Sequence, residues 1–170
     1  WTASSDAPAT YIYKADADAN WTLCTLATKT FKYFAKGRNA AGSELLWGGN
    51  AGGSNTHSIY HSTDPTNAGA WTGPITIGQS DSEITGLVED GDTVLVLKTN
   101  GIWAYYTDGT SKNLTPDFDP AMAHPDNFRA HFNWNGHVLV SGGYGGLYEV
   151  VGGNLYNISL ELSAPDQTTL

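Results

Sequence analysis

The chain has 170 residues, and its formal net charge is −9 because 17 aspartate and glutamate side chains outnumber 8 lysine and arginine side chains. Nucleic acids and anionic membrane surfaces both select clusters of basic side chains, so this composition argues against either as a partner. Cys24 is the only cysteine, which excludes an intramolecular disulfide, and its apolar neighbours in Trp21–Leu26 favour a small buried residue.

Residues 1–30 predict the second half of a four-stranded unit. Tyr11–Lys14 and Trp21–Leu26 are short runs of aromatic and β-branched residues, which are typical of β-strands. The turn between them contains Asp16, and residues 1–8 are small and polar, as expected of coil. The segment is therefore predicted to be a partial unit that holds only a third and a fourth strand.

Three complete units are predicted next, over residues 31–77, 84–115 and 127–160. Each contains four short runs of strand-forming residues; the last run of the first unit is Pro74–Ile77, and the first run of the third unit is Phe128–Asn133. In the second unit these runs are separated by dipeptides that supply the positive φ angles of tight hairpin turns: Asp90-Gly91, Asn100-Gly101 and Asp108-Gly109. The polar tail, residues 161–170, contains a proline and is expected to leave the folded units as a linker.

The third predicted strands align across the four units. Their central apolar residues are 47, 43 and 45 positions apart: Ile12, Ile59, Ile102 and Leu147. A period of about 40–50 residues with four strands is typical of β-propeller blades, which stack because one blade cannot bury both of its faces alone. The sequence therefore predicts an all-β fold, a β-propeller of about three and a half antiparallel blades. Closed rings have about four to eight blades, so a longer parent chain or other chains are expected to complete the ring.

Two turns between predicted third and fourth strands place a tryptophan after an aspartate: Asp16 with Trp21, and Ser62 and Asp64 with Trp71. Both turns resemble the Asp-box of sialidase-type (BNR) repeat propellers, Ser-x-Asp-x-Gly-x-Thr-Trp. The first turn lacks the serine, and the second is two residues longer than the motif. The resemblance implies a structural role, in which the aspartate caps backbone N–H groups of the turn and the tryptophan packs beneath it.

Three sequence triplets match the acceptor pattern of N-glycosylation: Asn20-Trp21-Thr22, Asn113-Leu114-Thr115 and Asn157-Ile158-Ser159. Such triplets are common by chance. They bear on function only in a eukaryotic secretory context.

Long irregular loops are predicted to gather on one rim of the propeller. In a meander, the loops from the second to the third strand and from one blade to the next lie at the same end of the sheets. The segments that fall in this group are 48–57, 78–83, 116–126 and 142–145. Because rigid scaffolds carry recognition on loops, this rim predicts a ligand site, with the candidate residues Asn55, His57, Asp117, Asp119 and Tyr144. Tyr60, Trp103 and Tyr148 recur at one repeat position and are predicted to pack in the core. Tyr144 is instead flanked by glycines, which suits stacking on a sugar or on a partner protein.

No catalytic, metal-binding or cofactor-binding residue is predicted. Arg38 and Arg129 are too few for the three-arginine site of a sialidase. A retaining glycosidase needs two close carboxylates, but Asp117 and Asp119 lie in a proline-rich loop, where aspartate usually caps turns or faces solvent. The histidines have no spacing typical of metal ligands.

Residues 58–115 contain the blocks DPTNAGAW, ITGLVEDGDTVLV and NGIWAYYTDG in this order. They resemble the propeller repeats of phage and metagenomic virion-associated proteins, and at repeat level the resemblance covers about residues 9–160. It implies a viral structural protein of a tail, fibre or surface decoration. The predicted function is a non-enzymatic structural or recognition module, located in a virion or another extracellular assembly, that associates with other protein subunits and binds protein or glycan. Two alternatives stay open: a fragment of a carbohydrate-active, glycoside hydrolase-like propeller enzyme, and a piece of a cell-surface adhesin.

Overall fold

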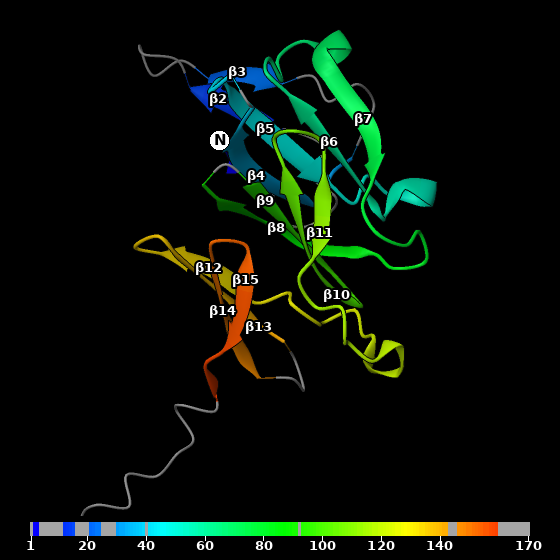
Figure 1. Ribbon diagram of the computed structural model, residues 1–170. Coiled ribbons are helices and arrows are strands. Elements are labelled where there is room, and N and C mark those ends of the chain that lie inside the picture. The colour runs from blue at the N-terminus through cyan, green and yellow to red at the C-terminus, as the bar shows by residue number, and fades with distance from the viewer. Residues whose placement is uncertain are drawn as a thin grey trace, which may run out of the picture.

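The computed structural model describes residues 2–3, 12–15, 21–24, 30–39, 41–91, 93–142 and 146–159. In these residues the chain forms fifteen short strands and three single-turn 3₁₀ helices (Figure 1). The strands make up four antiparallel sheets. The fold is therefore all-β, as the sequence predicts.

Each sheet is a meander, in which strands that follow one another in the chain lie side by side. The first sheet has three strands: β1 (Thr2–Ala3), β2 (Ile12–Ala15) and β3 (Trp21–Cys24). The second consists of β4 (Tyr33–Arg38), β5 (Glu44–Gly49), β6 (Ser58–Ser62) and β7 (Trp71–Thr76). The third consists of β8 (Ile84–Asp90), β9 (Thr93–Lys98), β10 (Gly101–Tyr106) and β11 (Ser111–Asn113). The fourth consists of β12 (His131–Trp134), β13 (His137–Ser141), β14 (Leu147–Val151) and β15 (Asn154–Asn157). Three four-stranded antiparallel units are thus confirmed.

Strand boundaries differ from the predicted ones at three places. Thr2–Ala3 pairs with β2 where coil is expected, so the first sheet has three strands instead of two. The strand β7 begins at Trp71, before its predicted start, because Trp71 already pairs with Ser62 across the turn. Phe128 is predicted to begin a strand, yet its φ of 57° lies in the left-handed region, and β12 begins only at His131.

The hairpin between β12 and β13 has the expected two-residue turn. Asn135 and Gly136 have φ angles of 52° and 82°, and Trp134 pairs with His137 on either side of them. Positive φ at both central residues is the mark of a type I′ turn, whose twist matches that of the flanking strands. Asparagine and glycine reach these angles with little strain, so this turn is encoded locally.

The four-stranded sheets stack face to face along the chain. We name the face that a sheet turns toward the next sheet in the chain its leading face, and the opposite one its trailing face. One core cluster joins the leading face of β4–β7 (Ala35, Leu45, Trp47, Ile59) to the trailing face of β8–β11 (Leu87, Val94, Val96). A second cluster joins the leading face of β8–β11 (Val88, Leu95, Ile102, Ala104) to the trailing face of β12–β15 (Val138, Val140, Val150). Alternate residues of one strand therefore pack on opposite neighbours.

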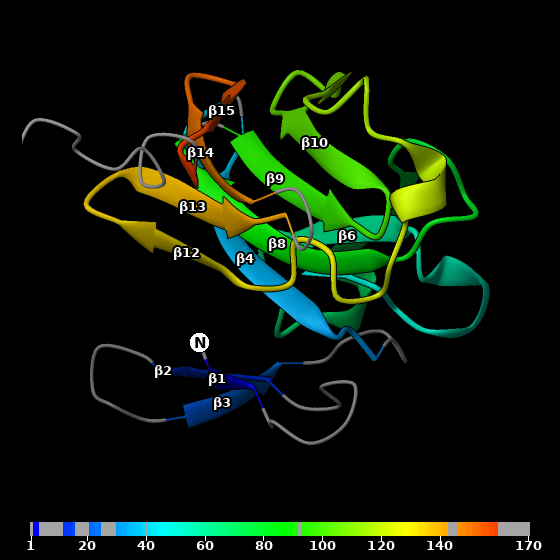
Figure 2. The same cartoon turned by 90° about the horizontal axis from the view of Figure 1, so that it is seen from below.

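The first strands of the three four-stranded sheets, β4, β8 and β12, lie side by side (Figure 2). Gly86 lets β12 approach β8, because a Cβ at this position would collide with the His131 imidazole. The side-chain amide of Asn133 donates a hydrogen bond to the Glu89 carbonyl at 3.2 Å. A small residue and a polar bridge thus position one sheet against the next.

Lys98 holds the connection between the second and the third sheet. Its side chain is fully buried, and Nζ donates hydrogen bonds to the carbonyls of Ile77 (2.6 Å) and Gln79 (2.5 Å). Burial lowers the pKa of the Lys98 ammonium to about 8, and the nearby Asp81 carboxylate opposes this shift. Both hydrogen bonds remain possible after deprotonation, since a neutral amine still has two N–H donors.

We expect the free energy of unfolding to rise between about pH 8 and pH 10. In this window the unfolded state, with an ordinary lysine pKa of about 10.4, binds a proton that folded Lys98 has released, so higher pH favours the folded state. The contribution of Lys98 to the rise is about 1 to 3 kcal/mol. Urea unfolding at several pH values in this window measures it.

The variant Lys98→Met should flatten this rise, because it removes the shifted group. The exposed Lys32 provides the control, and Lys32→Met should keep the rise of the wild-type protein. The same slope in Lys98→Met as in the wild type would contradict the assignment.

Candidate ligand-binding site

A pocket of about 380 Å³ lies at the boundary between the third and the fourth sheet. One wall is the segment that connects β11 to β12, and the other belongs to the sheet β12–β15. The lining residues are Leu114, Thr115, Pro116, Asp117, Phe118, Asp119, Met122, Asn127, Gly142, Tyr148 and Leu155. This volume lies within the range of about 300–1,000 Å³ that is usual for small-molecule sites.

Two phenylalanines anchor the connecting segment in the core. Phe128 is 1% exposed, and its ring packs against that of Phe118 with the centroids 5.7 Å apart and the planes at 59°. Phe128 belongs to the core cluster between the two sheets, and the partly buried Phe118 packs against this cluster and also lines the pocket. Tilted aromatic contacts of this kind are favourable beyond the burial of area. The apolar part of the pocket is therefore continuous with the core.

Two carboxylates lie in the pocket lining. Asp119 Oδ1 accepts a hydrogen bond from the Ala121 N–H at 2.9 Å and caps the 3₁₀ helix η3 (Pro120–Met122). Asp117 is exposed and makes no hydrogen bond or ion pair with any residue that the structure describes. Among these lining residues there is no basic side chain. The pocket thus offers hydrogen-bond acceptors and negative charge to a ligand.

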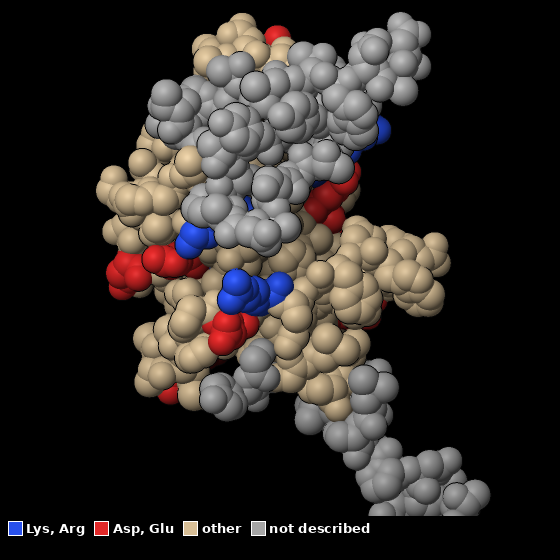
Figure 3. All heavy atoms as spheres, turned by 180° about the vertical axis from the view of Figure 1, so that it is seen from behind, with Lys and Arg blue, Asp and Glu red and all other residues tan. Residues whose placement is uncertain are grey.

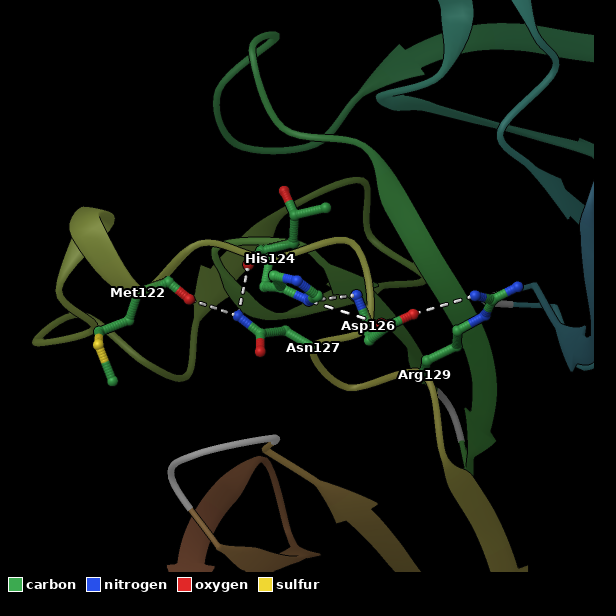
Figure 4. A network of polar contacts seen from close by, with 6 residues as sticks. Met122, His124, Asp126, Asn127 and Arg129 are labelled. Carbon is green, nitrogen blue, oxygen red and sulfur yellow. Dashed lines mark hydrogen bonds and ion pairs between the residues drawn. The ribbon is translucent and has the colours of Figure 1, made fainter.

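Asn127 fixes the loop that carries η3, as Figure 4 shows. Its side chain is buried, and Nδ2 donates hydrogen bonds to the carbonyls of Met122 (2.8 Å) and Thr99 (3.0 Å). The N–H of His124 donates to the same Thr99 carbonyl at 3.2 Å. One buried amide therefore ties the pocket wall to the turn between β9 and β10.

The outer end of this loop carries weaker contacts. Arg129 donates from a guanidinium nitrogen to Asp126 Oδ1 at 3.1 Å, and the Asp126 N–H donates to His124 Nδ1 at 3.2 Å (Figure 4). The three residues are exposed, so solvent screens the ion pair and it adds little to stability. The position of the loop depends on Asn127 rather than on this pair.

Gly142 and Tyr148 meet in the wall formed by β12–β15. A Cβ at the buried Gly142 would collide with the Tyr148 ring, so only glycine leaves room for the ring in its present place. The Gly142 N–H donates to the Gly146 carbonyl at 2.7 Å, which closes the loop between β13 and β14. Tyr148 is half-buried, and its ring borders both the core and the pocket.

The structure brings together some of the residues predicted for ligand binding and leaves others apart. Asp117 and Asp119 line the pocket. Asn55, in the 3₁₀ helix η1 (Gly53–Asn55), and His57 belong to the loop between β5 and β6 and are not part of its lining. That loop is tied to the next sheet, because the Ile84 N–H donates to the Thr56 carbonyl at 2.9 Å. Tyr144 lies outside the described residues.

The predicted Asp-box-like turn at Asp64 is stabilised by side chains. Asp64 Oδ1 accepts hydrogen bonds from the N–H (3.2 Å) and the hydroxyl (2.5 Å) of Thr66, and Ser62 Oγ accepts from the Asp64 N–H at 3.1 Å. Trp71, at the end of the 3₁₀ helix η2 (Ala68–Ala70), packs on Phe31 with the ring centroids 5.0 Å apart. These contacts match a structural role. Asp16 and the side chain of Trp21 lie outside the described part of the chain.

Asp108 occupies the equivalent turn of the next sheet and forms the same contacts. Its Oδ1 accepts from the N–H (2.8 Å) and the hydroxyl (2.6 Å) of Thr110. The hydrogen bond from the Thr110 hydroxyl, and then that from the N–H, lower the pKa of the Asp108 carboxyl. A plain Asp-Gly turn thus keeps the capping aspartate without the tryptophan of the Asp-box.

Two of the glycosylation-like triplets are structural turns. Asn113 Oδ1 accepts from the Thr115 N–H at 2.9 Å, and Thr115 Oγ1 accepts from the Ile102 N–H at 2.9 Å. In the fourth sheet, Asn157 Oδ1 accepts from the Ser159 N–H at 3.1 Å. In both triplets, the asparagine side chain bonds to the backbone two residues later and forms the turn that follows the fourth strand, β11 or β15.

Sequence reasoning missed several residues of the pocket. Tyr60, Trp103 and Tyr148 recur at one repeat position and are predicted to be core. Tyr60 is 2% exposed, whereas Trp103 and Tyr148 are half-buried at the edges of the core clusters. Nothing in the sequence separates these cases, since the exposure of each ring depends on how the sheets and connections pack around it. Asn127 has a local signal, because asparagine side chains in loops often bond to nearby backbone groups.

Acidic and basic side chains are interspersed on the face seen in Figure 3, with Asp and Glu in separate groups. The Lys36 ammonium and the Glu44 carboxylate form an ion pair at 2.6 Å between exposed side chains. Such pairs contribute about 0–1 kcal/mol.

No group of three or more histidine, cysteine, aspartate or glutamate side chains in the described part of the chain is placed to hold a metal ion. No helix within the described ranges has the length and apolarity needed to cross a membrane.

Comparison with known proteins assigns no family to the chain. No protein-family model matches the chain, and no curated protein matches its sequence. The pocket and the stacked sheets therefore carry the functional argument.

We expect Asn127→Ala to loosen the pocket wall and to lower the free energy of unfolding by about 1–3 kcal/mol, because it removes a buried donor to two carbonyls. Denaturant unfolding measures the loss, and amide hydrogen exchange should speed up around residues 119–127. Asn133→Ala is the matched control, since Asn133 also donates from Nδ2 to a backbone carbonyl but is exposed. Equal effects of the two substitutions would argue against a clamp at Asn127.

Proposed function

We propose that the three four-stranded sheets are consecutive blades of a β-propeller. The support is their common meander order, their stacking of leading face on trailing face, and the side-by-side position of their first strands (Figure 2). In a propeller, the first strands of successive blades surround a common axis. The repeat period of the sequence points to the same architecture.

We further propose that this propeller is a recognition module without catalytic activity, and that the pocket beside the β11–β12 connection is its ligand site. The observation that carries the proposal is the pocket itself, in which two carboxylates and two aromatic rings line one concavity. It lies at the end of the sheets where the connections between blades run, the usual place for binding on a rigid scaffold. Its aspartates are exposed or engaged in capping, which suits binding more than catalysis.

A glycan is the ligand that fits this lining best. Sugar hydroxyls donate hydrogen bonds, and carboxylates such as those of Asp117 and Asp119 accept them strongly. The C–H faces of sugar rings are apolar and pack on side chains such as Phe118, Met122 and Tyr148. Two carboxylates without a basic neighbour disfavour anionic sugars. The expected ligand is therefore a neutral or amino-sugar glycan.

The setting that we propose is a virion or another extracellular assembly, in which this chain associates with other protein subunits. The likeness of residues 58–115 to virion-associated propeller repeats supports this setting. A module of this kind attaches the assembly to a glycan-bearing surface and leaves the glycan intact.

Binding to an array of neutral, amino-sugar and anionic glycans tests the proposal, followed by calorimetric titration of the best ligand. Asp117→Asn should weaken binding about tenfold or more, because a charge-assisted hydrogen bond contributes about 1.5–3 kcal/mol. Asp64→Asn is the control: it changes an exposed capping aspartate that is not part of the pocket lining and should keep the affinity of the wild-type protein.

Two outcomes would count against the proposal. Failure to bind any glycan, or an affinity that Asp117→Asn leaves unchanged, would remove the pocket as the site. Release of sugar fragments that a single carboxylate substitution abolishes would favour a carbohydrate-active enzyme instead.

A further inference from the structure

The imidazole of His131 lies at the boundary between the third and the fourth sheet. His131 is the first residue of β12, and its ring lies against Gly86 of the neighbouring strand β8 (Figure 2). Its Cε1 and Nδ1 atoms are the first that a Cβ at Gly86 would meet. Asn133, on the same face of β12, bonds to the Glu89 carbonyl of β8. The ring is thus part of the contact that holds the fourth sheet on the third.

The Nδ1 atom of this ring is buried and has no hydrogen-bond partner among the described residues. A neutral imidazole tolerates such a place, because it can carry its proton on Nε2 and leave Nδ1 as an unused acceptor. An imidazolium has an N–H group on both nitrogens, so protonation would create a buried donor without an acceptor, which is costly. The charged ring gains hydration only by moving away from Gly86, and this movement separates β12 from β8.

The surroundings of the ring offer little compensation for a positive charge. The ionisable side chains on the strands β8, β9 and β13 and on the segment before β12 are Glu89, Asp90, Lys98, His137 and Arg129. None of them is among the causes that set the pKa of His131. Burial lowers this pKa, and the backbone of Phe128 and Arg129 opposes the shift more weakly. No carboxylate of these elements therefore stabilises the imidazolium.

The pocket spans the same boundary. One of its walls is tied to the third sheet, because Asn127 Nδ2 donates to the Thr99 carbonyl at 3.0 Å. The other wall belongs to the fourth sheet and includes Tyr148 of β14. A movement of β12 away from β8 therefore displaces one wall of the pocket from the other.

We propose that His131 makes this boundary sensitive to acid, so that protonation of its ring parts β12 from β8 and releases the ligand from the pocket. This inference rests on the proposed function, because it names the regulation of the proposed ligand site. The contact between the sheets should respond to acid whether or not a ligand is present.

The direction of the effect follows from proton binding. As the pH falls below about 6.5, a histidine outside the folded contact binds a proton before the buried His131 does. The closed boundary therefore loses stability between about pH 6.5 and the lower pKa of His131 in the folded protein. One titrating group changes this equilibrium by at most about tenfold per pH unit.

His61 provides a matched comparison at the other boundary. It is half-buried on the leading face of β4–β7, where its ring packs on Trp47 with the centroids 4.8 Å apart. Burial lowers the pKa of His61 as well. The overall stability of the protein thus responds to acid through both histidines, whereas the contact between β8 and β12 should respond through His131.

Amide hydrogen exchange on the ligand-free protein tests the proposal. Protection factors in β8 and β12, corrected for the intrinsic rates, should fall between about pH 7.5 and about pH 5 in the wild-type protein. His131→Phe and His131→Gln remove the titrating ring and should abolish the fall. Two variants are used because one of them can fail to fold. His61→Phe should keep the fall in β8 and β12. A wild-type protein without the fall, or a fall that both His131 variants keep, would overturn the inference.

Ligand binding supplies the second readout. The affinity for the glycan that binds best in the array should drop over the same pH range in the wild-type protein and in His61→Phe, but not in the His131 variants. By linkage, the bound glycan should also lower the pH at which the His131 ring titrates, as followed by nuclear magnetic resonance with isotope-labelled histidine.

The two proposals fail separately. Glycan binding through Asp117 that does not change with pH would end the acid response and leave the recognition function standing. Acid-dependent exchange in β8 and β12 that His131→Phe abolishes, in a protein that binds no glycan, would retain the sensitive boundary and remove the ligand site.

Discussion

A four-stranded β-sheet has two broad faces, and one sheet alone cannot shield both from water. This constraint shapes the whole chain. Along β8 and β9, alternate residues such as Leu87 and Val88 or Val94 and Leu95 serve different neighbours, one the sheet before and the other the sheet after. Each interior sheet is therefore apolar on both sides. The sheet β8–β11 is therefore buried by two neighbours, one on each face.

Polar side chains position the connections between sheets and the turns at strand ends, which the apolar faces do not contact. Lys98 and Asn127 are both buried, and each bonds to two backbone carbonyls of a connection between sheets. At strand ends, a single side-chain oxygen of Asp64, Asp108 or Asn113 accepts a hydrogen bond from a backbone N–H group. Buried backbone groups outside strands need such partners. The loops of this fold are therefore ordered by a few long or amide side chains, while the sheets are ordered by burial.

Features encoded over a few neighbouring residues could be predicted from the sequence. The Asn135-Gly136 turn and the continuous apolar, β-branched run of β9 depend on local preferences, so their outcome is close to the expectation. The place of Asp117 in an irregular loop could be predicted for the same reason, since this loop is rich in proline and aspartate. The place of Phe118 and Tyr148 in the pocket could not be predicted, because it depends on how two sheets meet. Tertiary contacts also draw Phe128 out of a strand, as its ring fills the core from a left-handed backbone.

The pocket has walls from two different sheets, with Asp117 and Phe118 on the connecting segment and Tyr148 on β14. Parting the sheets therefore destroys the site, and by linkage any occupant raises the free energy needed to part them, by an amount that grows with the logarithm of its concentration. If the proposed binding to a surface puts the chain under tension, the bound ligand would stabilise the contact between the third and the fourth sheet against that tension.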